Sequence, residues 1–201
     1  MQKAARWAYL GLASLLALAA LFFALPLGRP AFMHAPVSTG TALVGGPFSL
    51  INQRGETVTE KTYLGHFALL FFGFSHCKDI CPTELQVMAS ALQDLGPAAA
   101  NITPIFVSID PERDTPPVLA AYVANFGPGL QGLTGSAEQV AAMAKAYHVY
   151  YRKVPGPDPQ DYEMEHSTTI YLMGPDGTFI KHFEYTTDTK ALAESLKSVL
   201  R

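Results

Sequence analysis

Cysteine and charge are both scarce in this chain of 201 residues. Two residues are cysteine, and charged residues make up 15% of the sequence. The 14 lysines and arginines are nearly balanced by 17 acidic residues and nowhere gather into a stripe. Because nucleic-acid-binding domains carry a basic patch, this pattern predicts no nucleic-acid partner. No internal repeat or low-complexity tract is present either, so no repeat architecture is expected.

Charge is absent altogether from residues 7–27. As a helix this segment would be about 31 Å long, close to the hydrocarbon thickness of a bilayer. Lys3 and Arg6 precede it, and the positive-inside rule places that end in the cytoplasm. We therefore expect one N-terminal transmembrane helix, with the rest of the chain exported. A cleaved secretory signal is the alternative, but its apolar region would be unusually long, and no clear small-x-small cleavage site follows.

Residues 28–46 contain proline, glycine and small polar residues, which is typical of a linker. The chain then divides into a cytoplasmic stub and anchor (1–27), this linker (28–46) and a folded domain (47–201). Met33 and His34 are metal-binding residue types within the linker, but a lone Met-His pair carries little weight. The short start lacks an Arg- and Ser-rich transit peptide. This favours a bacterial inner-membrane protein with its domain in the periplasm.

Strand-like and helix-like segments alternate through the folded domain. Expected strands cover residues 47–51, 56–58, 68–74, 103–109, 130–133, 149–154, 168–173 and 178–185, and expected helices open at Pro82, after Thr115, after Ser136 and after Asp188. Residues 155–161 are expected to form a proline-rich loop. Strands that alternate with helices, followed by a hairpin and a closing helix, predict an α/β sandwich around a central mixed sheet.

The two cysteines, Cys77 and Cys81, lie where the strand over residues 68–74 ends and the helix at Pro82 begins. Unpaired N–H groups and the dipole at a helix N-terminus favour negative charge, so both thiolates should form more easily. The spacing of four residues is about one helical turn and can turn both sulfurs toward one point. A dicysteine in this place fits a thioredoxin-like version of the sandwich.

Three interpretations of this pair remain open from the residues alone. A structural disulfide would suit an exported protein, although so short a loop constrains the unfolded chain little. A redox-active dithiol is favoured by the helix N-terminus, but the usual spacing has two intervening residues rather than three. A metal site needs further ligands. Two thiolates favour Cu(I), and an added imidazole keeps Cu(II) and zinc open.

Histidines are the obvious source of a further ligand. His76 adjoins Cys77 and is expected to tune its pKa more than to bind metal. His166 closes a long loop before the strand over residues 168–173, which in a thioredoxin-like sheet lies beside the dicysteine. Position alone leaves the role of His166 undecided. Three others are expected to be ordinary surface or packed residues: His66, His148 and His182.

Four motifs occur in order along the folded domain: GFSHCKDICPTEL (73–85), VSIDPERDT (107–115), GLTG (132–135) and DYEMEHS (161–167). Together with the apolar N-terminal segment, they resemble the Sco (SenC) family of copper chaperones for cytochrome c oxidase assembly. The resemblance extends over nearly everything from about residue 46 onward. It implies a thioredoxin-like fold in which two cysteines and one histidine hold copper as Cu(I), Cu(II) or both.

Carried over to this chain, the implied copper ligands are Cys77, Cys81 and His166. Asp79 matches the family's acidic residue between the cysteines and would influence the site without binding the metal. The resemblance also implies partners: the copper-centre subunit of cytochrome c oxidase, and another periplasmic copper chaperone or a thiol reductase.

The sequence departs from the family pattern at two places. His76-Cys77-Lys78 stands where Cys-Pro is commoner, and Glu165 replaces the usual aspartate before the histidine. Neither change removes a ligand. Lys78 is expected to favour the thiolates by its charge, and His76 is left open as an extra or alternative ligand. Residues 110–115 are interpreted as a capped turn at a strand end rather than as a catalytic motif.

Two functions of different classes follow. The first is a non-enzymatic metallochaperone that passes copper to the dinuclear copper centre of cytochrome c oxidase. The second is a thiol-disulfide oxidoreductase in which Cys77 and Cys81 reduce the cysteines of that same centre. A peroxidase would need a threonine and an arginine that activate peroxide around its cysteine, and the neighbourhood of Cys77 lacks that pattern.

Overall fold

The computed structural model describes residues 43–157 and 161–200. The anchor expected over residues 7–27 and the linker residues Met33 and His34 lie outside the described residues. Within the described part of the chain, no helix combines the length and the apolar character needed to cross a membrane.

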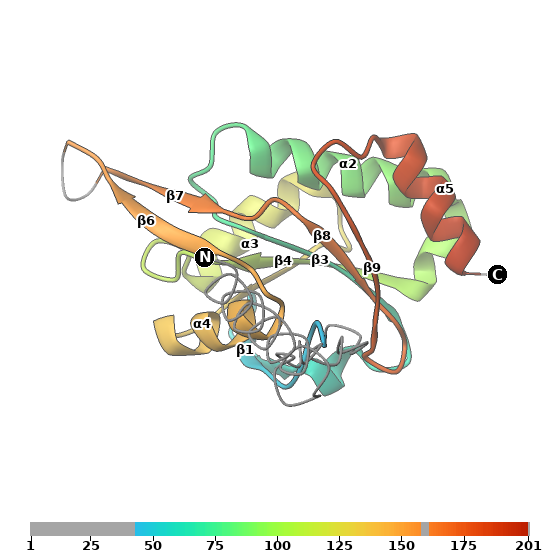
Figure 1. Ribbon diagram of the computed structural model, residues 1–201, viewed down its shortest axis with the longest axis horizontal. Coiled ribbons are helices and arrows are strands. Elements are labelled where there is room, and N and C mark those ends of the chain that lie inside the picture. The colour runs from blue at the N-terminus through green and yellow to red at the C-terminus, as the bar shows by residue number, and fades with distance from the viewer. Residues whose placement is uncertain (1–42, 158–160, 201) are drawn as a thin grey trace, which may run out of the picture. The chain divides into compact units, whose positions relative to one another are not determined.

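A seven-stranded mixed sheet forms the centre of the domain (Figure 1). In spatial order its strands are β2 (Thr57–Thr59), β1 (Ser49–Asn52), β5 (Gln131–Thr134), β4 (Ile102–Ser108), β3 (Phe67–Gly73), β8 (Ile170–Met173) and β9 (Phe179–Phe183). Strands β3, β4 and β5 run parallel, whereas β1 pairs antiparallel with β5 and β8 pairs antiparallel with β3. The predicted α/β sandwich with a central mixed sheet is confirmed.

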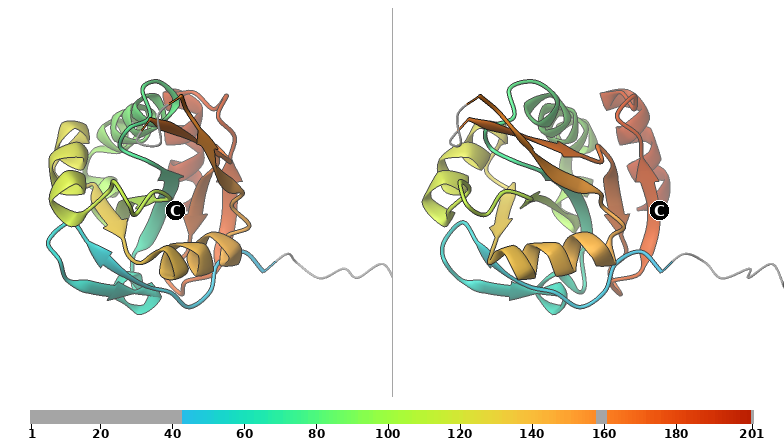
Figure 2. Two further views of the ribbon diagram at one scale, coloured as in Figure 1. Left: turned by 90° about the vertical axis from the view of Figure 1, so that its left-hand side faces the viewer. Right: turned by 60° about the vertical axis from the view of Figure 1, so that its left-hand side comes forward.

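In the part of the chain that the structure describes, four α-helices cover the sheet. They are α2 (Ile80–Leu95), α3 (Pro116–Val123), α4 (Ala137–Ala146) and α5 (Thr189–Val199), with short 3₁₀ turns η2 (Glu60–Tyr63), η3 (Gly96–Asn101) and η4 (Ala124–Phe126). Helices α2 and α5 pack against each other on one side of the sheet, and α4 lies on the other side (Figures 1 and 2). The central strands are therefore covered on both faces.

Strand β3 shows why this arrangement follows from the sequence. Its residues are all apolar apart from the terminal glycine, and Phe71 and Phe72 are buried. A strand covered on both faces needs an unbroken apolar run rather than an alternating one. The run predicted over residues 68–74 is that strand, shifted by one residue.

The predicted helix starts are confirmed where a side chain caps the helix. The Ser136 hydroxyl accepts a hydrogen bond from Gln139 N at 3.2 Å, and the Gln139 side chain accepts one from Ser136 N at 2.8 Å. Asp188 likewise accepts from Ala191 N at 2.8 Å. These bonds satisfy backbone donors that have no partner within the helix.

The start of α2 differs from the prediction. The helix begins at Ile80 rather than at Pro82, with Asp79 in the capping position. A proline is tolerated anywhere in the first turn because the N–H groups there have no intrahelical acceptor. Cys81 consequently lies inside the helix, whereas Cys77 lies in the loop before it.

The segment leading to His166 was also predicted wrongly. It is not a loop but the strand β7 (Tyr162–His166), which pairs antiparallel with β6 (Tyr151–Pro155) in a separate two-stranded sheet. Figure 1 shows this hairpin extending away from the central sheet. The sequence YEMEH has no β-branched residue, so its intrinsic strand propensity is weak. The cross-strand side-chain pairs with β6 stabilise the strand instead.

Candidate metal centre

The loop between β3 and α2 carries Cys77 close to the start of the helix. Cys77 is half-buried and Cys81 is fully buried. Cys77 N donates to Phe74 O at 3.2 Å, which turns the loop, and Cys81 N donates to Cys77 Sγ at 3.4 Å. The Cys77 sulfur therefore accepts a hydrogen bond from the free N-terminal end of α2, as the sequence predicted.

The Cys81 sulfur lies directly against the end of β3. A Cβ atom placed on Gly73 would stand 2.8 Å from Cys81 Sγ and 2.9 Å from the Phe106 ring. Real Cβ atoms do not approach sulfur so closely, so only glycine leaves room for this cysteine. This role of Gly73 was not predicted. A glycine that ends a run of bulky residues just before a dicysteine is the signal that would have found it.

His166, at the end of β7, points at the same place. Its Nε2 lies 3.6 Å from Cys81 Sγ, and its Nδ1 lies 2.8 Å from Ser167 O. A carbonyl oxygen can only accept, so Nδ1 carries the proton of the neutral ring, and the Nε2 lone pair faces the sulfur. The ring also meets Phe71 and Phe74 edge-on, with centroids 6.2 and 6.0 Å away.

These three side chains form a donor set suited to a soft or borderline metal ion. Thiolate and imidazole ligands on one ion, bound at about 2.3 and 2.0 Å, would lie about 3.5–3.7 Å apart. The distance of 3.6 Å between Cys81 Sγ and His166 Nε2 fits that spacing. Among residues 43–157 and 161–200, no group of three or more His, Cys, Asp or Glu side chains has the geometry of a preformed metal site.

The two thiols differ in acidity. The pKa of Cys77 is lowered, chiefly because the Cys81 thiol hydrogen-bonds to its sulfur, with help from the backbone N–H groups at the helix start. The same bond, together with burial, raises the pKa of Cys81. The reduced pair therefore carries its negative charge on Cys77. Lys78 is exposed, and its expected effect on the thiolates stays a prediction.

A groove of about 390 Å³ opens in front of the pair. Cys77, Lys78 and Asp79 line one side of it, and residues 163–166 of β7 line the other. Asp79 thus lies at the mouth of the groove with an exposed side chain, a position from which it can influence the site without binding metal. The groove gives a metal ion or a partner protein access to Cys77 and His166.

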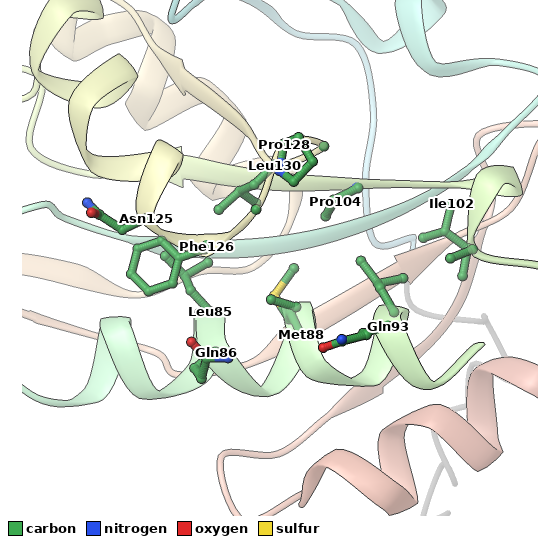
Figure 3. Close-up of a pocket in the computed structure, with 15 residues that line it drawn as sticks. Leu85, Gln86, Met88, Gln93, Ile102, Pro104, Asn125, Phe126, Pro128 and Leu130 are labelled. Carbon is green, nitrogen blue, oxygen red and sulfur yellow. The ribbon is translucent and has the colours of Figure 1, made fainter. Parts of the chain in front are cut away.

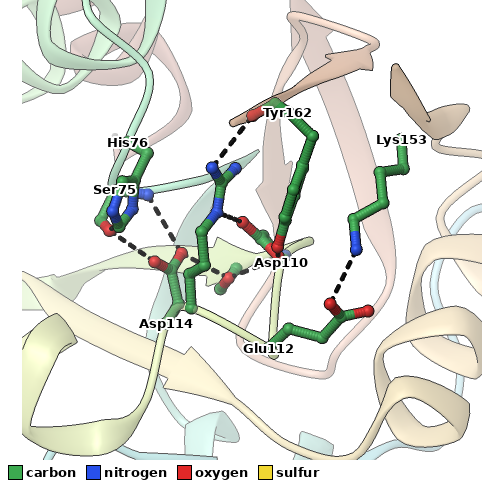
Figure 4. A network of polar contacts seen from close by, with 9 residues as sticks. Ser75, His76, Asp110, Glu112, Asp114, Lys153 and Tyr162 are labelled. Carbon is green, nitrogen blue, oxygen red and sulfur yellow. Dashed lines mark hydrogen bonds and ion pairs between the residues drawn. The ribbon is translucent and has the colours of Figure 1, made fainter. Parts of the chain in front are cut away.

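The other histidines that the structure describes lie on the surface. His76 is exposed, its Nδ1 is 3.2 Å from Ser75 Oγ (Figure 4), and it does not line the groove. His148 Nε2 is 3.2 Å from Leu43 O, and His182 pairs with Glu184 at 3.1 Å. His66, His148 and His182 are all exposed, and their interpretation as ordinary residues stays a prediction.

A larger cavity of about 520 Å³ lies elsewhere, between α2 and the segment that joins η4 to β5 (Figure 3). Leu85, Met88, Phe126 and Leu130 are among the residues that line it. None of its lining residues is charged, histidine or cysteine. The cavity therefore offers no acid-base group and no thiolate or imidazole ligand, and we place the site at the cysteines.

Comparison with known proteins gives a consistent result. The SCO1/SenC family model matches residues 36–201. The human "Protein SCO1 homolog, mitochondrial" is 43% identical over 164 residues, which are 81% of this chain and 54% of the human protein. The chain thus spans about half the length of that relative.

Two solved structures are also similar. One is "Bradyrhizobium japonicum ScoI with copper bound", with a TM-score of 0.72 and 42% identity over 77% of this chain and 98% of that one. The other, with a TM-score of 0.62 and 26% identity over 79% of this chain and 94% of that one, concerns "a disulfide switch in BsSco, a member of the Sco family of cytochrome c oxidase assembly proteins".

Proposed function

The chain belongs to the SCO1/SenC family, and from that premise we propose that it is a copper metallochaperone whose ligands are Cys77, Cys81 and His166. The observation that carries this proposal is the approach of His166 Nε2 to Cys81 Sγ at 3.6 Å, between residues 85 positions apart in sequence. A structural disulfide or a simple dithiol enzyme has no need of an imidazole at that point.

Each ligand has a distinct part in binding. The Cys77 thiolate is ionised before copper arrives and is open to the groove, so it is the first donor that copper meets. The buried Cys81 thiol must lose its proton as it binds, because only a thiolate is an effective ligand. The two sulfurs suffice for Cu(I). The Nε2 lone pair of His166 adds the harder nitrogen donor that Cu(II) favours.

The receiving partner we propose is the subunit of cytochrome c oxidase that holds its dinuclear copper centre. BsSco, a relative with the same fold, is described as one of the cytochrome c oxidase assembly proteins. The groove beside Cys77 lets a partner's ligands approach the copper from the open side while Cys81 still holds it. A periplasmic copper chaperone or a thiol reductase would supply copper or electrons by the same route.

We further propose that residues 7–27 anchor the protein in a bacterial inner membrane, with the copper domain in the periplasm. The uncharged run of that length and the preceding Lys3 and Arg6 support this placement. Such an anchor holds the carrier on the same membrane as the oxidase it serves.

A thiol-disulfide oxidoreductase is the second candidate, and the unequal thiols favour it. The Cys77 thiolate would attack a disulfide of the partner, forming a mixed disulfide and releasing one partner thiolate. Cys81 would then lose its proton and attack the Cys77 sulfur. That step closes the Cys77–Cys81 disulfide and releases the second partner thiolate, so the partner gains two electrons.

Parallel assays on one preparation separate these functions. The reduced protein is titrated with Cu(I) against a chromophoric competitor, and its reduction of a disulfide peptide is followed separately. The metallochaperone proposal predicts one tightly bound Cu(I) ion and only slow disulfide reduction. Fast turnover of the peptide without tight copper binding would show that the chain is the reductase instead.

A further inference from the structure

The turn after β4, residues 110–114, contacts the cysteine loop through Asp114. This side chain is fully buried. Its carboxylate accepts hydrogen bonds from Ser75 N at 3.0 Å, from Ser108 Oγ at 2.6 Å and from the Ser75 hydroxyl. Ser75 lies two residues before Cys77, so Asp114 fastens the cysteine loop to the end of β4 (Figure 4).

The same turn contacts the β6–β7 hairpin through Asp110 and Arg113. The Tyr162 hydroxyl donates to Asp110 Oδ1 at 2.7 Å, and Arg113 Nη1 donates to Tyr162 O at 2.9 Å. The Arg113 guanidinium also lies 3.7 Å from the centre of the Tyr162 ring and pairs with Asp110. Tyr162 is therefore held by its ring, its hydroxyl and its backbone.

Tyr162 and His166 occupy the two ends of β7. The hairpin pairs with itself rather than with the central sheet, so no ladder of backbone hydrogen bonds fixes it to the body of the domain. An exposed ion pair between Lys153 and Glu112 at 2.7 Å is a second link to the same turn. Exposed ion pairs contribute little, so of these two links between the hairpin and the turn the partly buried contacts of Tyr162 are the firmer.

We propose that residues 110–114, which we name the bracket, set the distance between Cys81 Sγ and His166 Nε2. Asp114 positions the cysteine loop, while Asp110 and Arg113 position β7, and all three residues belong to the same turn of five residues. The bracket is a positioning device and touches no copper ligand itself. This inference rests on the proposed function, because copper binding by Cys81 and His166 is what gives the distance between them a purpose.

A plain structural role for the turn makes a different prediction. If residues 110–114 only cap α3 and stabilise the domain, changing them lowers stability but leaves the His166 ring where it is. A positioning role requires the ring to move while the central sheet stays intact. The edge-on contacts of the His166 ring with Phe71 and Phe74 provide a direct readout, because aromatic rings shift the NMR signals of nearby protons.

Tyr162→Phe and Arg113→Lys test the bracket. The first removes only the hydroxyl that donates to Asp110. The second keeps the charge but loses the planar fork that reaches Asp110 and Tyr162 together. Tyr185→Phe is the matched control, because Tyr185 is exposed on the surface. Each reduced, copper-free protein is compared with wild type by the ring-proton signals of His166, and each is then titrated with Cu(II) and Cu(I).

We expect displaced His166 signals in both variants and wild-type signals in the control. We also expect Cu(II) affinity to fall about threefold in Tyr162→Phe and at least about tenfold in Arg113→Lys, with little change for Cu(I). Unmoved His166 signals, or moved signals with wild-type Cu(II) affinity, would overturn the bracket. If wild type itself does not bind copper, the proposed function fails. The NMR comparison still decides the positioning role, because displaced His166 signals in the variants support it and unmoved signals refute it.

Discussion

Cys81 Sγ lies 3.6 Å from His166 Nε2, although the two residues are 85 positions apart in the sequence. One belongs to the first turn of α2 and the other to the last position of β7. The contact joins a helix packed on the central sheet to a hairpin outside it.

Gly73→Ala should displace the Cys81 sulfur, because the new Cβ would stand 2.8 Å from it. Overpacking of this kind costs about 1–3 kcal/mol of stability. We expect a lower unfolding midpoint and weaker binding of both Cu(I) and Cu(II). Gly129→Ala is the matched control, since nothing lies within 4 Å of a Cβ at that position. Wild-type copper affinity in Gly73→Ala would show that the sulfur does not depend on this space.

Cys77 should react as a thiolate at neutral pH. Its pKa is lowered, first by the hydrogen bond from Cys81, so its alkylation midpoint should fall below the ordinary value of about 8.5. In Cys81→Ala the midpoint of Cys77 should rise, because that donor is gone. Alkylation rate against pH in the reduced, copper-free protein measures both midpoints. A wild-type midpoint at or above the ordinary value contradicts the arrangement.

Glu84 should make the folded domain less stable as the pH rises. Burial raises its pKa to about 7, against an ordinary value of 4.5, so the folded state favours the neutral acid. The stability that this proton contributes is complete below about pH 4.5 and is lost as the pH passes 7, by up to about 3 kcal/mol. Glu84→Gln cannot ionise and should be more stable than wild type at pH 8, but not at pH 4.5.

Unfolding of wild type and Glu84→Gln by denaturant at pH 4.5 and at pH 8 tests the predicted direction of this pH dependence of stability. Glu194→Gln is a suitable control, because Glu194 is exposed on α5. An equal difference between Glu84→Gln and wild type at both pH values would mean that Glu84 does not titrate between them.

Residues 7–27 should remain in the mature protein. If they form an uncleaved anchor, the mature N-terminus lies at Met1 or Gln2, and the protein fractionates with membranes. N-terminal sequencing of protein from fractionated cells checks both points. A mature terminus beyond residue 27 would refute the anchor while leaving the copper proposal intact.

Much of the fold was predictable because its signals are local. Ser136 with Gln139, and Asp188, cap helices through bonds to residues three positions away, so the sequence alone indicates where α4 and α5 begin. The apolar run of β3 is equally direct. The strand predicted over residues 149–154 corresponds to β6, but β7 was missed because its stability comes from pairing with β6 and from Tyr162, not from the propensity of its own residues.

The site was predictable only in part, because local sequence patterns do not show contacts between residues that are far apart in the chain. Cys77 and Cys81 are close in sequence, and their place at a helix start follows from local pattern. The role of His166 came from family resemblance, since nothing local joins it to the cysteines. Residues 110–115 were interpreted only as a capped turn, because a buried carboxylate such as Asp114 shows its partners only once the chain is folded.

The binding of Cu(II) to His166→Ala tests the central claim most directly. The reduced variant and wild type are titrated with Cu(II), followed by the thiolate-to-Cu(II) absorption band, and with Cu(I) in competition. His76→Ala is the matched control, because His76 is exposed and does not line the groove. We predict that His166→Ala loses at least about a hundredfold in Cu(II) affinity and much less for Cu(I), while still forming the Cys77–Cys81 disulfide. Wild-type Cu(II) affinity and spectrum in His166→Ala would contradict the account, and the same loss in His76→Ala instead would move the third ligand to His76.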